Sequence, residues 1–521
     1  MFGPFGNFPI KKPEIRTVTL KKKITVPVSR NKPADAKSAR AKSHATSSLR
    51  KSSAPASLQL VKNGTDSRSS SPLKRSADST LSLAGSSKKR KASAPVVQKF
   101  SDSEDTSESD DADLSPERVR VKSSTDSLPP DVGREIWTIN KNKEANAKEE
   151  DDTGLIHGKR LVKRDKDAAY KSAFPSEENI ATLELRYPGS AKPERFSLVE
   201  PVEHDGYKPL EDILETIERV LTHYFPASLS SRYLDDSTGI VRRLKRAIHH
   251  RDLPKFRAVL TEYDTLIRNS LSSSITTHLT SQHHLPLPLI ERILSQIYAR
   301  TVSPQVSLLR DYENGTDNVY GELLPRFSHQ IFAVTGLNSS HTFVDLGSGV
   351  GNVVLQAALE TGAESWGIEM MPNPCKLGEA QAAEFPLRCR KWGIRPGKVT
   401  LVQGDFLTSP AIDTVLRRAD VVLVNNQAFL PTLNDKLIMK FLDLKDGCRI
   451  VSLKSFVDEG HRIQARNIED PRNVLTNVKR LEYWSGSVSW TDQGGSYFVA
   501  VKDSSMVREA TERMRKRARA S

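Results

Sequence analysis

The chain has 521 residues, enough by length for about two to four domains, but only 37% of them are hydrophobic and the mean hydropathy is −0.48. Part of the chain is therefore too polar to fold. The longest apolar runs are far shorter than a membrane span, and no apolar segment follows Met1. Cys375, Cys389 and Cys448 lack the spacing of a disulfide framework or a zinc site. We expect a soluble intracellular protein without a bound metal or a membrane partner.

The formal net charge is +14, and the basic residues are concentrated at the N-terminus. The first hundred residues carry about 22 Lys and Arg against about 4 Asp and Glu, whereas the rest of the chain is nearly neutral. Residues 1–130 cannot bury enough apolar area to offset the entropy of ordering them, so we predict a disordered arm. The basic part, residues 1–100, suits the phosphate backbone of DNA through counterion release.

Two charge runs lie within this arm. A candidate nuclear import signal, possibly bipartite with Lys74 and Arg75, is formed by Lys88, Lys89, Arg90 and Lys91. A solvated charge run is the alternative interpretation. Residues 101–113 are acidic and rich in serine, so they could bind a basic surface or be phosphorylated; a disordered solubilising stretch explains them equally well. We interpret residues 131–180, which are mixed in charge, as a linker.

A folded region begins near residue 181. Residues 182–187 alternate like a strand, and residues 195–200 are its expected partner. Helices are expected at about 239–249, 254–274 and 287–300, after a first helix that carries the apolar residues Leu210, Ile213, Leu214, Ile217, Val220, Leu221 and Tyr224. Residues 181–335 should thus form a mostly helical subdomain.

Strands and helices alternate over residues 336–505, which predicts an α/β domain with a parallel sheet covered by helices on both faces. After the first strand at 342–344, further strands should end at Glu369, Gln403, Asn425 and Leu453. A closing antiparallel pair is expected near 488–490 and 497–501, and residues 506–521 read as a basic tail. Ligands of such a sheet bind beyond the carboxyl ends of its strands.

The most informative stretch lies at the end of the first strand. There Asp345 is followed by a glycine-rich turn at 347–351 and by a helical pattern. Glycines let the backbone pass close to a ligand, and Glu369 at the next strand end is placed to bind both hydroxyls of a ribose. An ordinary strand–helix turn is the alternative. Because Asp345 would repel a pyrophosphate and suit a cation, we infer a turn that binds S-adenosylmethionine rather than a dinucleotide.

Two further strand ends carry suitable side chains. Asp405 could accept the adenine amino group while Phe406 covers the ring, although a helix cap with simple packing is the alternative. Asn425 would be a neutral donor and acceptor at the reaction centre, or else Asn425 and Asn426 only form a turn. The prolines of the Asn/Asp-Pro-Pro-aromatic motif of DNA adenine methyltransferases are missing here, so a planar base amine is not the obvious target.

Two segments outside the strand ends complete the pattern. Tyr320, Gly321 and Glu322 could cover the cofactor, with Glu322 meeting its amino group, although the same residues read alone as a helix start. Trp490 and Tyr497 bring aromatic rings to the last strand pair, where such residues are usually core.

Together these motifs resemble the Dot (disruptor of telomeric silencing) family of non-SET histone-lysine methyltransferases, over roughly residues 180–505. The motifs that carry the resemblance are residues 319–322, 343–352, 404–407, 424–429, 449–456 and 486–491. Several motifs in order and correctly spaced are far more specific than any single one. The basic arm is similar to that of the fungal branch, in which such an arm helps to hold the nucleosome.

The resemblance implies a seven-stranded, Rossmann-like class I methyltransferase fold with S-adenosylmethionine as methyl donor. It implies a lysine in the globular core of nucleosomal histone H3 as acceptor, contacts with other histone surfaces, a nuclear location and a part in telomeric silencing. A methyltransferase of RNA or of a non-histone protein is the alternative. A chromatin scaffold with an inactive fold is disfavoured, because Asp345, Glu369 and Asn425 are all present.

The resemblance also implies roles for individual residues. The lid loop would comprise Tyr320, Gly321, Glu322 and Leu323. The methionyl part would be cradled by Phe343, Val344, Asp345, Leu346, Gly347, Ser348, Gly349, Val350, Gly351 and Asn352. Glu369 would hold the ribose, and Asp405 and Phe406 the adenine. The lysine channel would be lined by Phe429, Trp490 and Tyr497, with Asn425 and Tyr497 as catalytic residues. Two positions depart from the family: Asn352 stands where glutamine is usual, and Gln427 where an aromatic residue is frequent.

Overall fold

The computed structural model describes residues 128–139, 153–162, 169–175, 180–203, 206–270, 274–310 and 320–520. The predicted import signal and acidic patch lie outside these residues, as does nearly all of the predicted disordered arm. None of the helices in the described ranges combines the length and the apolar character that crossing a membrane requires.

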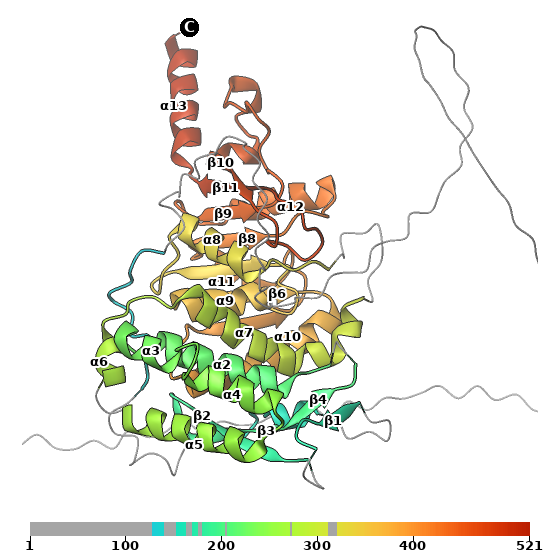
Figure 1. The fold of residues 1–521 in the computed structure, drawn as a ribbon. Helices are drawn as coiled ribbons and strands as arrows, with labels where there is room; N and C mark the ends of the chain where they lie inside the picture. The colour runs from blue at the N-terminus through green and yellow to red at the C-terminus, as the bar shows by residue number, and fades with distance from the viewer. Residues whose placement is uncertain are drawn as a thin grey trace, which may run out of the picture. The chain divides into compact units, whose positions relative to one another are not determined.

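A seven-stranded sheet forms the C-terminal half of the fold (Figure 1). Its strands, in chain order, are β5 (Thr342–Leu346), β6 (Glu364–Glu369), β7 (Val399–Gln403), β8 (Val421–Val424), β9 (Arg449–Ser452), β10 (Leu475–Tyr483) and β11 (Gly495–Lys502). They are arranged in space as β10-β11-β9-β8-β5-β6-β7. Strands β5 to β9 pair in parallel, whereas β11 pairs antiparallel with both β9 and β10. The predicted α/β sheet with an antiparallel edge is therefore confirmed.

The central strands are buried on both faces. All four residues of β8 are apolar and buried, as expected for a parallel strand covered by helices on each side. In β5 every residue is also buried, and one of them is an acid, Asp345. Strand β5 pairs with β6, the next strand in the chain, along one edge and with β8 along the other. The sheet order therefore reverses between β5 and β8, which is where ligands bind in sheets of this kind.

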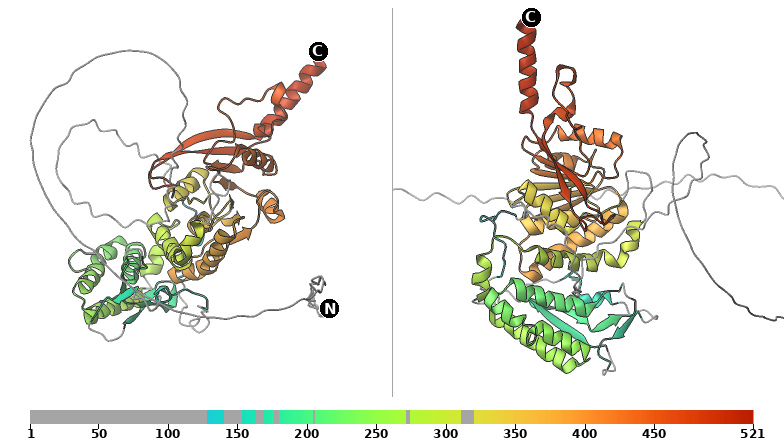
Figure 2. Two further views of the ribbon diagram at one scale, coloured as in Figure 1. Left: turned by 90° about the vertical axis from the view of Figure 1, so that its right-hand side faces the viewer. Right: turned by 45° about the horizontal axis from the view of Figure 1, so that its top comes forward.

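Six helices belong to this half of the chain: α8 (Pro325–Thr335), α9 (Asn352–Thr361), α10 (Pro372–Trp392), α11 (Pro410–Leu416), α12 (Pro431–Phe441) and α13 (Ser505–Ala520). Two short 3-10 helices, η3 (Ala465–Asn467) and η4 (Pro471–Val474), precede β10. Proline is the first residue of α8, α10, α11 and α12. The N–H at this position has no partner within a helix, so proline, which lacks it, is tolerated there. Helix α13 extends away from the sheet in both views of Figure 2.

The N-terminal subdomain is mostly helical, as predicted. Its helices are η1 (Gly158–Leu161), α2 (Pro209–His223), α3 (Ala227–Tyr233), α4 (Ile240–His249), α5 (Leu253–Ser270), α6 (Ser274–Thr280), α7 (Leu287–Thr301) and η2 (Ser303–Arg310). Two small antiparallel pairs accompany them, β1 (Tyr170–Ser172) with β4 (Val199–Pro201) and β2 (Thr182–Tyr187) with β3 (Ser190–Ser197). Figure 1 shows these strands beside α5, at the opposite end from α13.

Two strand predictions need correction. Residues 488–490 are not a strand of the sheet: Val488 forms only isolated bridges with Leu323 and Thr491, and the edge strand is β10. Most of β10 is exposed, so its sequence lacks the apolar alternation on which the prediction relied. The predicted partner of β2 at 195–200 is right only for residues 195–197, which pair with β2. The pairing strand β3 already begins at Ser190, and Val199 and Glu200 belong to β4, which pairs with β1.

One hydrophobic core joins the helical subdomain to the sheet domain. It contains apolar residues of α2, α4, α5 and α7 together with Leu355 and Leu359 of α9 and Phe385 and Trp392 of α10. The Trp392 indole donates to Gln296 Oε1 of α7 at 2.9 Å. Ile136 and Ile139, in the segment predicted as a linker, are buried in the same core.

This shared core gives a prediction about truncation. A fragment of residues 336–505 should not fold cooperatively, whereas residues 128–521 should. The fragment would expose Leu355, Leu359, Phe385 and Trp392, each no more than 2% exposed in the whole protein. Exposure costs roughly 1.5–3 kcal/mol for each such side chain, which together rivals the entire stability of a domain. Urea unfolding followed by circular dichroism tests this, and a single sharp transition in the short fragment would contradict it.

Candidate active site

A cavity of about 390 Å³ lies at the carboxyl ends of the parallel strands. It is bordered by the turn after β5, the ends of β6 and β8, the loop after β7, and residues 320–323 ahead of α8. These elements meet where the strand order reverses, so the topology of the sheet fixes the position of the cavity.

The glycine turn after β5 forms one side of the cavity. Gly347 and Gly349 have φ angles of 91° and 55°, which side chains other than glycine rarely adopt. The backbone N–H groups of Gly347 and Ser348 both donate to Ile368 O at 2.9 Å and tie the turn to β6. A Cβ atom on Gly347 would meet no other atom within 4 Å, whereas one on Gly349 would come within 3.0 Å of the Tyr320 ring. The turn thus leaves open space above Gly347.

Two carboxyl groups stand at neighbouring strand ends. Asp345 is 4% exposed, and burial, together with the negative charge of Glu369, raises its pKa well above the usual range. Glu369 accepts hydrogen bonds from Gly349 N to Oε2 at 2.9 Å and from Met371 N to Oε1 at 2.8 Å. Each oxygen of a carboxylate has two acceptor positions, so Glu369 can still accept two hydroxyl groups.

A third carboxyl group enters from the loop at 320–323. Glu322 is 7% exposed, and its Oε1 accepts hydrogen bonds from Tyr320 Oη at 2.5 Å and Tyr298 Oη at 3.2 Å. Burial raises the pKa of Glu322 to about 7, even though both hydrogen bonds favour the ionised form. Glu322 therefore changes charge near neutral pH.

The loop at 320–323 is held in place by Ser489 and Trp490, which precede β11 in the chain. Glu322 N donates to Ser489 Oγ and Ser489 N donates to Glu322 O, each at 2.9 Å. A Cβ atom on Gly321 would lie 2.7 Å from the Trp490 ring, so only glycine fits there. Trp490 supports the loop in this way and does not line the cavity. Val319, also part of the predicted motif, lies outside the described residues.

Asp405 and Phe406 follow β7 and both line the cavity. Asp405 Oδ1 accepts a hydrogen bond from Leu407 N at 2.8 Å, so the acid also caps its own turn, which was the alternative interpretation. The Phe406 and Phe429 rings lie 6.2 Å apart at a tilt of 30°. These two rings give this end of the cavity a flat, apolar boundary.

The two asparagines after β8 have different surroundings. Asn425 lines the cavity, where its Nδ2 donates to Gly321 O at 3.3 Å and its buried Oδ1 has no hydrogen-bond partner among the described residues. Asn426 is fully buried, and its Oδ1 accepts from Leu453 N at 3.0 Å and from Lys454 N at 2.8 Å. The turn-forming interpretation thus suits Asn426, while Asn425 is available to a ligand.

The cavity brings together most of the predicted residues. Those that line it are Tyr320, Gly321, Glu322, Leu323, Asp345, Gly347, Ser348, Gly349, Val350, Asn352, Glu369, Asp405, Phe406, Asn425 and Phe429. Phe343, Val344 and Leu346 are buried in the core, and Gly351 caps α9. Tyr497 is also fully buried, with its ring 5.1 Å from that of Phe327, so it lies outside the cavity lining.

Sequence reasoning missed several apolar lining residues, namely Leu308, Leu309, Val353, Met370, Met371, Pro374, Leu407, Leu423 and Leu433. Met370 and Met371 directly follow Glu369, so their place after a strand end could have revealed them. Leu308 and Leu309 come from η2, far from the glycine turn in sequence, and no local pattern indicates their position.

The chemistry of the lining residues limits the ligand. The described residues that line the cavity include four carboxyl groups, those of Glu322, Asp345, Glu369 and Asp405, and no Lys, Arg or His. On its boundary the buried Asn425 Oδ1 has no hydrogen-bond partner in the described part of the chain, and the Asn352 side chain supports the Glu322 carboxylate. Such groups fit a cationic ligand with hydroxyl and amino groups and disfavour a phosphate. S-adenosylmethionine has these properties.

This combination of sheet order, glycine turn and acidic strand ends defines a class I methyltransferase fold. The family model described as "Histone methylation protein DOT1" matches residues 298–502.

Relatives extend this likeness over most of the chain. An H3 lysine-79 specific histone-lysine N-methyltransferase of Aspergillus fumigatus is 51% identical over 80% of this chain and 82% of its own length. The enzyme of the same name from Emericella nidulans is 52% identical over 74% of this chain and 77% of its own length. Among solved structures, an RNA methyltransferase from Salinibacter ruber matches 34% of this chain and 90% of its own at 21% identity, with a TM-score of 0.23. The identities to the fungal enzymes show that this chain belongs to the DOT1 family of histone methylation proteins.

The buried carboxyl of Glu322 gives a prediction about stability and pH. Its pKa in the folded protein, about 7, lies above the ordinary 4.5, so its contribution to stability is full below pH 4.5 and is lost as pH rises through 7. The loss amounts to about 3 kcal/mol. Glu322→Gln does not ionise, so the ligand-free variant should gain stability relative to the native protein over that pH window.

Urea unfolding at a series of pH values measures this gain. Glu379→Gln, on the exposed side of α10, is the matched control and should follow the native protein. A stability difference between Glu322→Gln and the native protein that stays constant with pH would contradict the burial of an ionisable group at this position.

The two asparagines give a paired prediction. Asn426→Ala should lower the free energy of unfolding by about 2–4 kcal/mol, because it leaves the buried Leu453 N–H and the partly buried Lys454 N–H unpaired. Asn425→Ala should cost less than about 1 kcal/mol, yet reduce methyl transfer at least about tenfold. Unfolding and activity measured on the same preparations separate the two roles, and equal stability losses would refute the division.

Proposed function

We propose that this protein is a histone-lysine N-methyltransferase that transfers a methyl group from S-adenosylmethionine to lysine 79 of histone H3 in the nucleosome. The acceptor is the one named for the fungal relatives. The observation that carries the proposal is the position of Asn425, which lines the cavity together with Glu322, Asp345 and Glu369 and whose buried Oδ1 has no hydrogen-bond partner among the described residues. One polar atom is thus available to an incoming amine beside an acidic site for the donor.

The residues present have suitable chemistry for each part of the donor. Glu322 and Asp345 would pair with its amino group, and Glu369 would accept hydrogen bonds from the ribose hydroxyls. Asp405 and Phe406 would hold the adenine, by analogy with other sites that combine one polar contact with an aromatic surface. When bound, the donor supplies a methyl group activated by a positively charged sulfur.

The acceptor lysine must lose a proton before it can attack. A free lysine with a pKa near 10.4 costs roughly 4 kcal/mol to neutralise near pH 7.5. Phe429 and its apolar neighbours on the lining would provide surroundings that favour the neutral amine, and the nearby positive sulfur would add to this effect. Asn425 Oδ1 can then accept an N–H of the amine and direct its lone pair into the cavity. Most of the acceleration would come from this alignment.

Transfer of labelled methyl to reconstituted nucleosomes, free histone H3 and RNA tests the proposal. We expect label on nucleosomal H3, and its loss when lysine 79 of H3 is replaced by arginine. Gly349→Arg should abolish transfer, because the new side chain would occupy the space of the Tyr320 ring. Label on RNA or on another protein instead would leave the fold intact and overturn the acceptor.

We further propose that the basic arm binds nucleosomal DNA, that the run Lys88 to Lys91 directs import into the nucleus, and that the enzyme acts in telomeric silencing. The charge concentrated in residues 1–100 supports DNA binding by counterion release. Removal of residues 1–127, which leaves all described residues in place, should weaken nucleosome methylation and flatten its dependence on salt.

Cofactor affinity of the truncated protein should equal that of the full chain, because the cavity is built from residues after 307. Titration of binding and nucleosome assays across a range of salt concentrations measure both quantities. An unchanged salt dependence would contradict a DNA-binding arm, and lost cofactor affinity would show that the arm acts on the fold instead.

A further inference from the structure

The hydrogen bond from Tyr298 to Glu322 connects the helical subdomain with the cavity. Tyr298 belongs to α7, is 2% exposed, and donates from Oη to Glu322 Oε1 at 3.2 Å. It packs with Val302, Leu309, Val350 and Leu377, which come from both parts of the fold. Tyr298 does not line the cavity, yet it contacts the carboxyl group that does.

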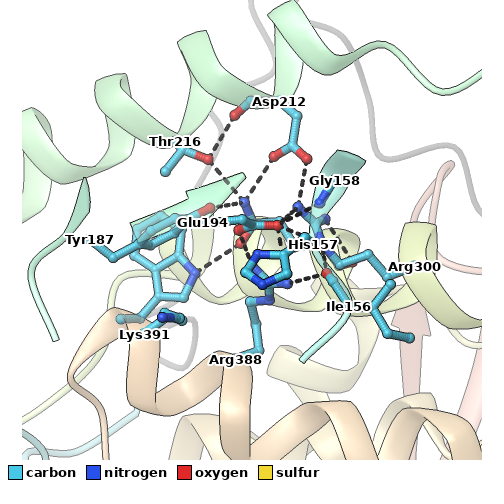
Figure 3. Close-up of polar contacts among 12 residues, drawn as sticks. Ile156, His157, Gly158, Tyr187, Glu194, Asp212, Thr216, Arg300, Arg388 and Lys391 are labelled. Carbon is cyan, nitrogen blue, oxygen red and sulfur yellow. Dashed lines mark hydrogen bonds and ion pairs between the residues drawn. The ribbon is translucent and has the colours of Figure 1, made fainter. Parts of the chain in front are cut away.

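Helix α7 is held in place by a buried set of charges two residues further on (Figure 3). The Arg300 side chain is fully buried, and its Nη2 bonds to Glu194 Oε1 at 2.7 Å and to Asp212 Oδ2 at 2.8 Å. Its Nη1 donates to Gln296 O at 3.0 Å, and its Nε donates to Ile156 O at 3.2 Å. Three segments distant in sequence, which contain Ile156, Glu194 and Asp212, therefore fix the end of α7 that carries Tyr298.

The sheet domain contributes to the same set of charges. Arg388 of α10 forms an ion pair with Glu194, bonds to Glu384 Oε1 at 2.7 Å, and donates to Ile156 O at 3.1 Å. Figure 3 shows Glu194 between the two arginines. Helix α10 begins just after Glu369, which lines the cavity. Because Glu194 pairs with Arg300 of α7 and with Arg388 of α10, it connects α7 to a helix that starts at the cavity.

We propose that Tyr298 is a positioning residue that holds the Glu322 carboxylate for the amino group of the cofactor, so that the helical subdomain forms part of the cofactor site. The inference rests on the proposed function for the identity of the cofactor.

The surroundings of Glu322 explain why a hydroxyl at this place matters. The titratable groups that face Glu322 are Tyr298 from α7 and Tyr320 from its own loop, and Asn352 at the start of α9 is the neutral neighbour. Asp345 and Glu369 line the same cavity from β5 and β6. Burial favours the neutral carboxyl, and the two hydroxyl donors oppose it. Loss of either donor should make Glu322 harder to ionise.

Tyr298→Phe tests the proposal because it removes the hydroxyl and keeps the ring. Cofactor binding is expected to be lost below a certain pH, at which Glu322 becomes protonated. In the variant this pH should be higher by about one unit, which corresponds to the loss of one hydrogen bond to a charged group. Affinity should fall about fivefold near pH 7, about tenfold well below that pH, and approach that of the native protein near about pH 9. Calorimetric titration from about pH 6 to about pH 9 gives this profile.

Tyr263→Phe is the matched control. Tyr263 in α5 is fully buried and donates to Arg186 O at 3.3 Å, and it is not among the described residues that line the cavity. Its loss should leave the pH profile of binding unmoved. An equal loss of affinity at every pH in Tyr298→Phe would indicate a merely structural role and overturn the proposal.

A second readout needs no cofactor. In the ligand-free protein, Tyr298→Phe should shift the pH-dependent part of thermal stability due to Glu322 to higher pH, and the shift should vanish when Glu322→Gln is added. An unmoved profile would also overturn the proposal. If the native protein fails to bind S-adenosylmethionine at all, the proposed function fails, whereas the ligand-free series still decides the role of Tyr298.

Discussion

The burial of carboxyl groups at the carboxyl edge of the sheet is the constraint on which the site depends. Asp345 and Glu322 are held in a cavity whose described lining residues include no basic side chain, and burial raises the pKa of both. A buried carboxylate is costly unless a positive charge or hydrogen bonds compensate for the loss of water. The protein accepts this cost where a cation can relieve it. The acidic cavity is thus a weak point of the ligand-free fold, which a bound cation would stabilise.

The remaining fold keeps these groups in place. Strand β5 is buried on all sides and places Asp345 at its end, and the glycine turn brings Gly349 N to Glu369. On the far side, Glu194 is fully buried between Arg300 and Arg388. Burial alone would raise the pKa of Glu194, but the two arginines lower it below the usual range. In contrast to Glu322, this carboxylate is compensated within the protein, which suits a structural group rather than a ligand-binding one.

Asn425 and Asn426 are adjacent in one turn, but their side chains form different hydrogen bonds. Both follow β8 and have the same chemistry, but Asn426 satisfies three backbone groups of the chain after β9, whereas Asn425 keeps an acceptor in the cavity. The first secures the geometry in which the second acts. The sequence alone left both interpretations open for the pair.

The features that could be predicted from the sequence are those that depend on residues close together in the chain. The glycine turn, the acids at 345 and 369, and the helical periodicity of α2 and α7 are local patterns, and the structure contains each of them. The contact between α7 and Glu322 could not be predicted, because α7 is fixed by ion pairs of Arg300 with Glu194 and Asp212, which are distant from it in sequence. The exposed edge strand β10 was missed for a different reason, since its polar residues carry no sign of the sheet to which it belongs. Tyr497 and Trp490, assigned to the lysine channel by resemblance, lie beside the cavity rather than on its lining.

The most direct test of this account is a count of the protons released when S-adenosylmethionine binds near pH 7. Calorimetry in buffers of different ionisation enthalpy gives that number. With Glu322 near its pKa of about 7 and Asp345 also raised, the account predicts release of roughly half a proton or more by the native protein, and less by Glu322→Gln. Binding with no release, or with release unchanged in the variant, would contradict the claim that buried carboxyl groups recognise the cofactor through its positive charge.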